Sequence, residues 1–293
     1  MATTPPVVEA RGLRKVYDGR AAVDGIDLTI QRGEVFALLG PNGAGKSTTA
    51  GILTGFRGRD AGEVTVLGAD PARAGRRWRS RIGVVWQQET EVPRLAVRTV
   101  VRHFAGYYPH PRDVDEVLDL AGLTERADAL AHSLSGGQRR RLDVALGIVG
   151  RPELLFLDEP TTGFDPQARR DFWRTVRGLA ADGTTIVLTT HYLDEVEALA
   201  DRVCVIADGR VRAEGATDSL GGRTAGLATV SWLVDGEPRS VDTDEPTRVV
   251  RRLSDDFSGE VPGLTVHRPT LEDVYLELIG APSVAAETTE VAA

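Results

Sequence analysis

Short apolar runs alternate with amphipathic stretches along most of this 293-residue chain. The segments VVEARGLRKVY and AVDGIDLTIQRG alternate apolar with polar residues, as half-buried strands do, and the second leads into the apolar run EVFALLG. Further short strands are predicted at RIGVVWQ, ELLFLDEP, TTIVLTTH and RVCVIADG. Continuous apolar strands that alternate with helices are typical of a parallel sheet covered on both faces. We therefore expect an α/β fold with a mainly parallel sheet.

The middle of the chain has a different period. From about residue 97 to 148 apolar residues recur at three- and four-residue spacing, for example in DVDEVLDLAGL, and this spacing predicts amphipathic helices. Because strands precede and follow this stretch, it is predicted to be a helical insertion into the sheet, covering about residues 88–150.

The composition changes after Leu220, where GGRTAG reads as a linker. Beyond it, LATVSWLVDGEPRSV predicts a hairpin that turns at Asp235-Gly236. Helices are predicted at PTRVVRRLSDD and TLEDVYLELIG, with the strand LTVH between them and a cap made by Thr270 and Asp273. The segment 281–293 has no aromatic anchor and is predicted to be disordered.

Composition and charge narrow the class of protein. The chain has 43 acidic against 35 basic residues, and this excess weighs against nucleic acid as a partner. Cys204 is the only cysteine, so an internal disulfide is excluded, and its apolar surroundings predict packing in a buried strand. No apolar stretch approaches the ~18–20 residues that cross a bilayer, and the N-terminus lacks the regions of a signal peptide. The sequence alone therefore predicts a cytoplasmic protein.

The segment GPNGAGKST (40–48) lies between an apolar strand and a helical pattern, which is the context of a phosphate-binding P-loop. Its glycines let the backbone curl so that successive N–H groups point at phosphate oxygens, and the following helix adds its positive dipole. Lys46 would contact the β- and γ-phosphates, and the hydroxyl of Ser47 would bind Mg²⁺. The alternative, a chance glycine-rich turn, does not explain the matching strand and helix.

Two carboxylates follow the apolar run of LLFLDEP (154–160) at the end of a predicted buried strand. Asp158 is placed to hold Mg²⁺ directly or through water. Glu159 can polarise a water molecule aimed at the γ-phosphate, as a general base does. The alternative is a pair of acids that caps a turn before Pro160, and the nearby P-loop argues for the catalytic interpretation.

The segment SLSGGQRRR (133–141) is an unusual helix start. Ser135 and Gln138 have the spacing of a capping box, but Gly136 and Gly137 lie between them, and each glycine costs about 0.5–1 kcal/mol relative to alanine in a helix. Exposed N–H groups, a hydroxyl and the helix dipole together form a second anion site. Since the P-loop already surrounds one triphosphate, the simplest arrangement is two chains head to tail, each closing this segment over the other's ATP.

The order of these motifs, with LSGGQ between a P-loop and LLFLDEP, resembles the ATPase subunits of ABC transporters from about residue 7 to 220. The resemblance implies a sandwich dimer with two ATP molecules at the shared interface. We expect a P-loop ATPase core with a mainly parallel sheet, an antiparallel β subdomain, an inserted helical subdomain and a small α+β C-terminal extension. The domains would be 7–220, with the insertion at about 88–150, then 221–280 and a tail at 281–293.

Four further positions are assigned by this resemblance. Tyr17 matches the aromatic residue that stacks on adenine, although a strand aromatic packed in the core is the alternative. Gln87 matches the glutamine that reaches Mg²⁺ and the attacking water, and the adjacent Gln88 leaves its register open. His191 matches the switch histidine that hydrogen-bonds the γ-phosphate and the general base. Asp165 matches the loop that meets the partner subunit, where the family usually has leucine before it and this chain has phenylalanine.

The expected site therefore has three groups of residues. The catalytic residues are Glu159, His191 and Gln87. The Mg²⁺ ligands are Ser47, Gln87 and Asp158. The residues expected to bind ATP are Tyr17, Gly40, Asn42, Gly43, Ala44, Gly45, Lys46, Ser47, Thr48, Ser135, Gly136, Gly137, Gln138 and Asp165.

Two basic runs need a separate interpretation. RAGRRWRSR (73–81) could contact nucleic acid or anionic lipid headgroups, but the acidic balance of the chain favours a solvated strand-and-turn surface. The same solvated surface is predicted for Arg139, Arg140 and Arg141, although the charge of Arg139 could make the local electrostatic potential more favourable for phosphate.

The segments LSGGQRRRLDVALGIVGRPELLFLDEPTTGFDP and RPTLEDVYLELIG resemble daunorubicin-resistance-type exporter ATPases, which pair with a separate permease. This resemblance implies drug or lipid-like export, while polysaccharide and ion exporters use similar subunits. The expected partners are a second copy of the chain and a multi-spanning membrane permease, with no nucleic acid. The chain would lie at the cytoplasmic face of the cell membrane, held by the permease through the helical insertion. A non-transport ABC ATPase that acts on a soluble partner is the alternative.

Overall fold

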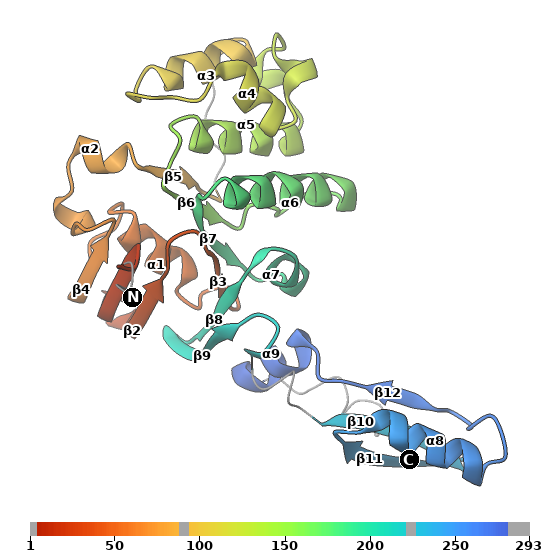
Figure 1. Cartoon of the computed structure of the whole chain (residues 1–293). Helices are drawn as coiled ribbons and strands as arrows, with labels where there is room; N and C mark the ends of the chain where they lie inside the picture. Colours follow the sequence, from red (N-terminus) through yellow and green to blue (C-terminus); the bar gives the residue numbers. More distant parts are fainter. Residues whose placement is uncertain (1–4, 88–93, 221–226, 281–293) are drawn as a thin grey trace. The chain divides into compact units, whose positions relative to one another are not determined.

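The structure is a computed structural model that describes residues 5–87, 94–220 and 227–280. The chain forms two compact units, Met1–Glu214 and Gly215–Ala293, so the division falls a few residues before the boundary predicted after Leu220. The predicted disordered tail, 281–293, lies outside the described residues, as do Gln88 and the first residues of the predicted insertion. The elements of each unit are labelled in Figure 1.

The first unit is organised around a six-stranded sheet of described strands in the order β5-β6-β7-β3-β8-β9. The pairs β5–β6, β6–β7, β7–β3 and β3–β8 are parallel, which confirms the mainly parallel sheet expected from the sequence. The bounds of these strands are β3 (Val35–Leu39), β5 (Ile82–Val85), β6 (Leu154–Asp158), β7 (Thr185–Thr190), β8 (Arg202–Ala207) and β9 (Arg210–Ala216).

The central strands of this sheet are buried on both faces. All residues of β3, β6 and β7 are buried, and alternate residues of β6 belong to two different hydrophobic clusters. Leu155 and Leu157 pack with the helices on one face, whereas Leu154 and Phe156 pack with the other cluster. This explains why the strands read as continuous apolar runs. Cys204 of β8 is also fully buried, as predicted, and burial raises the pKa of its thiol.

A second, antiparallel sheet in the same unit has the order β2-β1-β4. Its strands are β1 (Val8–Tyr17), β2 (Arg20–Ile30) and β4 (Ala61–Val66). Leu13, Ile26 and Leu28 of this sheet share a hydrophobic cluster with Phe36 and Leu38 of β3. The antiparallel subdomain therefore packs on one face of the parallel sheet and brings its strand ends toward the loop that follows β3.

The basic run 73–81 is not the strand-and-turn surface that the sequence predicted. It contains the end of a short 3₁₀ helix, η1 (Pro71–Arg73), and a helical turn, α2 (Arg76–Arg79). Trp78 is buried, and its indole N–H donates to the carbonyl of Val66 at 2.7 Å. A buried tryptophan anchors this segment to the antiparallel sheet, and the helical turn leaves Arg76 and Arg79 exposed around it.

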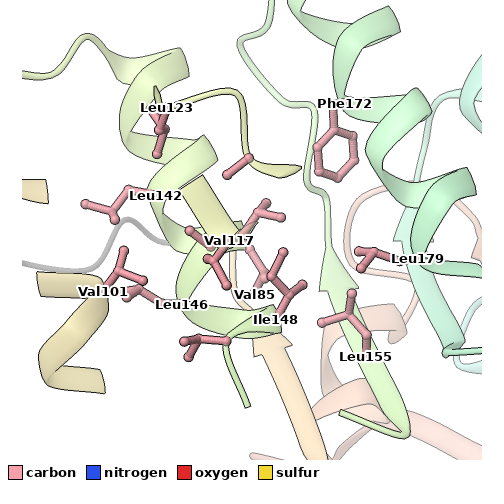
Figure 2. Packing of buried hydrophobic residues seen from close by; sticks show 14 of the residues in the cluster. Val85, Val101, Val117, Leu123, Leu142, Leu146, Ile148, Leu155, Phe172 and Leu179 are labelled. Atoms are coloured by element: carbon pink, nitrogen blue, oxygen red, sulfur yellow. The ribbon is translucent and has the colours of Figure 1, made fainter. Parts of the chain in front are cut away.

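The helical insertion is confirmed between β5 and β6. It contains α3 (Val97–Ala105), α4 (Val114–Leu120), the 3₁₀ turns η2 (Thr124–Arg126) and η3 (Ala131–Ser133), and α5 (Gly136–Ile148). Figure 2 shows apolar side chains of these helices meeting those of the sheet and of α6 (Pro166–Ala181), among them Val85, Val101, Val117, Leu142, Ile148 and Phe172. The remaining helices of this unit are α1 (Lys46–Leu53) after β3 and α7 (Leu193–Leu199) after β7.

The second unit is a small α+β arrangement, as predicted. Its antiparallel sheet has the order β11-β10-β12, with β10 (Ala228–Val234), β11 (Glu237–Thr243) and β12 (Thr265–His267). Asp235 and Gly236 both have positive φ, 52° and 85°, and form the predicted two-residue hairpin turn. The helices are α8 (Pro246–Asp256) and α9 (Leu271–Ile279), and Val230, Leu253 and Val261 form a buried hydrophobic cluster in this unit.

Candidate nucleotide-binding and hydrolysis site

The P-loop connects the buried strand β3 to α1, as the sequence predicted. Gly43 and Gly45 have φ of 81° and 103°, values that side chains rarely adopt. A Cβ at Gly45 would lie 2.2 Å from the carbonyl oxygen of Ala22, so only glycine fits where the loop passes β2. The loop lines a cavity of about 480 Å³ together with Tyr17, Ala22, Gln87 and Glu159.

Lys46 is the buried cation of this cavity. It is only 4% exposed, and its Nζ donates to the carbonyl oxygens of Gly40 at 2.7 Å and Pro41 at 3.1 Å. Burial lowers the pKa of Lys46, and the nearby carboxylates of Glu159 and Asp158 oppose this shift. The loop carbonyls thus hold the ammonium group beside the curled backbone, where phosphate oxygens are expected to bind.

Asp158 joins three elements at the end of the parallel sheet. Its Oδ1 accepts a hydrogen bond from the hydroxyl of Ser47 at 2.9 Å and another from the hydroxyl of Thr189, the next-to-last residue of the neighbouring strand β7. Sequence reasoning did not find Thr189, because its role depends on the pairing of Asp158 with Thr189 in adjacent strands. The arrangement places a hydroxyl and a carboxylate side by side next to the P-loop.

Glu159 is the point at which the predicted catalytic residues meet. Its Oε2 accepts a hydrogen bond of 2.9 Å from Nε2 of Gln87, and its Oε1 lies 3.6 Å from Nζ of Lys46 and 3.4 Å from Nδ1 of His191. The side chain of Glu159 is buried, with 8% exposed. The chain thus brings together the end of β5, α1, β6 and the residue after β7. Gln88 lies outside the described residues, so the choice of Gln87 over Gln88 stays a prediction.

Tyr17 lies at the open side of the cavity, at the end of β1. It is 39% exposed, which is not the buried core position of the alternative interpretation, and its hydroxyl accepts a hydrogen bond from Arg57 at 3.1 Å. Tyr17 also lines an adjoining cavity of about 280 Å³ with Arg20, Gly43 and Asp208 among others. An exposed ring beside the P-loop is available for stacking on a planar base.

The signature segment makes the predicted capping box at the start of α5. The hydroxyl of Ser135 accepts from the backbone N–H of Gln138 at 3.4 Å, and Oε1 of Gln138 accepts from the N–H of Ser135 at 3.2 Å. Gly136 and Gly137 line a different cavity, of about 340 Å³, with Gln87 and Glu159. Of the described residues that line the P-loop cavity, none comes from this segment. The signature glycines thus line a cavity that shares Gln87 and Glu159 with the P-loop cavity, but they do not line the P-loop cavity itself.

Asp165 and the residue before it have structural roles within the chain. Asp165 caps α6, with its Oδ1 accepting from the backbone N–H groups of Gln167 at 2.9 Å and Ala168 at 2.8 Å. Phe164 is 8% exposed and packs edge-on against Phe172 at 6.0 Å between ring centroids. The unusual phenylalanine thus fills the core of the chain itself, and Asp165 remains exposed at the surface.

Arg140 contradicts the prediction that the arginine run after the signature is a solvated surface. It is 6% exposed, and its guanidinium donates to the backbone carbonyls of Trp86, Asp158, Glu159 and Pro160. Three adjacent arginines on a helix point in three directions, so the sequence could not show which one turns inward.

Comparisons with known proteins agree with this geometry. Residues 23–162 match the ABC transporter family. The chain is 38% identical over 302 residues to the Nod factor export ATP-binding protein I of Ralstonia nicotianae, covering 94% of both chains. It is also 38% identical over 325 residues to the daunorubicin/doxorubicin resistance ATP-binding protein DrrA of Streptomyces peucetius, covering 100% of this chain and 98% of the relative.

The chain is also similar to solved structures of ABC transporter proteins. The chain superposes with a TM-score of 0.66 and 32% identity on cbiO1 from Clostridium perfringens, part of an ABC transporter complex, covering 73% of this chain and 90% of that one. It superposes with a TM-score of 0.66 and 25% identity on a dimeric post-hydrolysis state of the ATP-binding cassette MJ0796 with ADP and Pi, covering 72% and 98%. The chain therefore belongs to the ABC transporter family, as one of its ATP-binding and ATP-hydrolysing subunits.

Proposed function

We propose that this chain is the ATPase subunit of an exporter, that two copies close head to tail around two ATP molecules, and that they drive a separate multi-spanning permease. Export of a drug or a lipid-like compound is supported by the two relatives, of which one is named for Nod factor export and the other for daunorubicin/doxorubicin resistance. The observation that carries the proposal is the cluster of Lys46, Gln87 and His191 around the carboxylate of Glu159.

Glu159 is proposed to act as the general base. A general base must point at the attacking water, and the hydrogen-bond donors around the carboxylate of Glu159 hold it in one orientation. Gln87 fixes one carboxylate oxygen through a 2.9 Å hydrogen bond, and Lys46 and His191 lie beside the other. His191, with its ring against that of Tyr192, is proposed to contact both the γ-phosphate and Glu159.

The residues next to the P-loop fit a magnesium ion. The hydroxyl of Ser47 and the carboxylate of Asp158 are hard oxygen ligands that lie within 2.9 Å of each other. Within the described ranges there is no cluster of three or more histidine, cysteine or acidic residues that would form a protein cage. This suits Mg²⁺, which takes few protein ligands and completes its shell with phosphate and water. Ser47, Asp158 and Gln87 would hold the ion, which neutralises charge on the β- and γ-phosphates.

The position of the signature supports the proposal of a second copy. Ser135, Gly136 and Gly137 present a helix N-terminus with a hydroxyl, but they do not line the cavity of their own P-loop. An anion site of this kind is used if the triphosphate comes from another chain. The similar cassette MJ0796 is dimeric in its structure with ADP and Pi, which supports the proposal of a dimer.

The proposed location is peripheral, at the cytoplasmic face of the membrane. No helix in the parts of the chain that the structure describes has the length and apolar character needed to span a bilayer. We propose that the helical insertion, between Gln87 and the signature helix, is the docking surface for the permease. The alternative is a cassette of the same fold that acts on a soluble partner.

The variant Glu159→Gln tests both the base and the dimer, because it keeps the shape of the side chain but removes its basicity. We expect ATP turnover to fall by on the order of 10²–10⁴-fold. ATP should still bind, and light scattering with saturating ATP-Mg²⁺ should show a stable dimer. Purified from detergent-solubilised membranes of the source cells, the trapped variant should carry a multi-spanning protein with it.

A matched control is Glu153→Gln. Glu153 lies at the opposite end of strand β6 and pairs with Arg81 and Arg32 instead of the P-loop. This control should hydrolyse ATP at the normal rate. Unchanged turnover in Glu159→Gln would remove Glu159 from the role of base, and a strictly monomeric variant at saturating ATP-Mg²⁺ would refute the sandwich dimer. A dimer that is purified with a soluble partner alone would favour the non-transport alternative.

A further inference from the structure

The guanidinium of Arg140 lies beneath the turn that carries the proposed general base. Its Nε donates to the carbonyl oxygen of Pro160 at 3.0 Å, and its Nη2 donates to those of Asp158 at 2.8 Å and Glu159 at 3.3 Å. One side chain thus binds three consecutive carbonyl groups. Because Arg140 is 6% exposed, water does not compete strongly for these hydrogen bonds.

The turn that Arg140 holds has an unfavourable backbone. Glu159 has a φ of 45°, in the left-handed region that residues with a side chain rarely adopt. Such a conformation persists where the surroundings fix it from several sides. The N–H of Glu159 donates to the carbonyl of Thr189 at 2.9 Å, and the carbonyl of Glu159 accepts from Arg140. The backbone of the base is therefore fixed on one side by strand β7 and on the other by helix α5.

The same guanidinium also reaches the residue before Gln87. Its Nη1 donates to the carbonyl oxygen of Trp86, and the side chain of Gln87 donates to the carboxylate of Glu159 at 2.9 Å. Arg140 thus holds both backbone segments whose side chains form the Gln87–Glu159 hydrogen bond. These segments come from the ends of β5 and β6, and the arginine comes from the signature helix.

We propose that Arg140 is a positioning residue for ATP hydrolysis, which makes the placement of Glu159 and Gln87 depend on the position of the signature helix. The proposal rests on the proposed function, in which Glu159 is the base and the start of α5 meets the nucleotide of a second copy. Arg140 lies five residues after Ser135 on that helix, so a shift of α5 toward a nucleotide displaces the guanidinium as well. Loss of Arg140 should then slow turnover without weakening nucleotide binding at the P-loop.

The variants Arg140→Met and Arg140→Lys test this role. With methionine, kcat should fall by on the order of 10–100-fold, because displacement of a catalytic group by about 1 Å costs up to 10². The affinity for a fluorescent ATP analogue should stay within about twofold, because Arg140 is outside the P-loop cavity. Lysine should restore part of kcat, since it keeps the charge and three donors but lacks the planar fork.

A second buried arginine supplies the control for a merely structural effect. Arg112 is 8% exposed and pairs with Glu116 at 2.6 Å, and it makes no hydrogen bond to the segments at residues 86 and 158–160 among those described. Arg112→Met should lower thermal stability to a similar degree but leave kcat unchanged. If Arg140→Met and Arg112→Met change kcat equally, Arg140 has only a structural role and the proposal is wrong.

A double variant separates this proposal from the proposed base. In a Glu159→Gln background, Arg140→Met should lower the residual turnover by a smaller factor than in the wild-type background, because the general base that it positions is already removed and only the placement of Gln87 can still be lost. A loss as large as that in the wild-type background would show that Arg140 acts independently of Glu159 and would overturn the proposal. Normal turnover in Glu159→Gln would instead refute the base itself. If Arg140→Met does not fold, the same comparison is made with Arg140→Lys, and a kcat of the single variant Arg140→Lys equal to that of the unchanged chain would overturn the role.

Discussion

Helix α5 in the first unit and helix α9 in the second unit both begin with a capping box, and the two boxes are built differently. In α9 the hydroxyl of Thr270 accepts from the N–H of Asp273 at 3.1 Å, and the carboxylate of Asp273 accepts from the N–H of Thr270 at 2.8 Å. The corresponding distances in α5, between Ser135 and Gln138, are 3.4 and 3.2 Å. The box in the catalytic unit is thus the looser of the two.

The residues inside each box show what the difference means. In α9 the first helical residue is Leu271, which is 1% exposed, so this turn contributes to a core. In α5 the first two residues are glycines, and a Cβ on Gly137 would meet no atom of the described chain within 4 Å. Gly137 does not have a left-handed φ either, so nothing within the described chain requires a glycine there. The start of α9 serves folding, whereas the start of α5 has space at Gly137 that the atoms of the described chain do not fill.

The largest effect is expected for Gly137→Ala, a variant that separates the contribution of this position to folding from its proposed contact with a nucleotide. Gly137→Ala should lower ATP turnover by on the order of tenfold or more, because the methyl group occupies space proposed for the γ-phosphate of the second copy. The same change should raise stability by roughly 0.5–1 kcal/mol, the usual advantage of alanine over glycine in a helix. Steady-state hydrolysis and chemical unfolding measure the two effects on the same preparation.

Gly178 is the matched control for this variant. It lies within α6, and a Cβ there also meets nothing within 4 Å among the described atoms. Gly178→Ala should give the same stabilisation with unchanged turnover. If Gly137→Ala is as active as Gly178→Ala, the open start of α5 does not contact a nucleotide and the comparison between the two boxes loses its functional meaning.

A smaller effect is expected from removing the cap hydroxyls. Ser135→Ala and Thr270→Ala should each destabilise the local helix start by about 0.5–2 kcal/mol, with the larger loss in α9, where the hydrogen bonds are shorter. Hydrogen exchange at the amides of Gln138 and Asp273 reports this directly. Only Ser135→Ala should also lower ATP turnover. A loss of turnover in Thr270→Ala of equal size would show that capping as such, and not an anion contact, explains both results.

Both boxes were predicted from the sequence because a cap depends on two residues three positions apart. The P-loop, Asp158 and Glu159 were predictable for a similar reason, since each follows an apolar strand in the chain. Arg140 was not, because it binds carbonyl groups at residues 86 and 158–160 that only the tertiary fold brings to α5.

The prediction for the basic run around Trp78 was wrong for the same physical reason. Its arginines set the local composition, but the indole, which is buried and bonded to Val66, sets the local structure. Composition cannot show which face of a short segment meets a sheet, so a helical turn was predicted as strand and turn. Thr189 was missed in the same way, because its partner Asp158 lies in the adjacent strand and not nearby in the sequence.

The smallest expected effect concerns pH, because one box can titrate and the other cannot. Burial alone would raise the pKa of Asp273, but hydrogen bonds from Thr270 and from His267 of β12 lower it below its ordinary value of 3.8. A carboxyl whose pKa is lower in the folded state stabilises that state above the unfolded pKa, and this contribution is lost as the pH falls through the folded pKa. The α5 box contains Gln138, which carries no titrating proton in this range.

We therefore expect the protection factors of the first-turn amides of α9 to fall relative to those of α5 as the pH is lowered from about 5 to below 3.8. Hydrogen exchange, corrected for the intrinsic effect of pH, measures this difference within one molecule. Asp273→Asn should abolish the pH dependence, because its amide oxygen still accepts from the N–H of Thr270 but does not titrate. Equal losses of amide protection in α5 and α9 would mean that acid destabilises each unit as a whole. The titration of Asp273 would then make no difference between the two capping boxes.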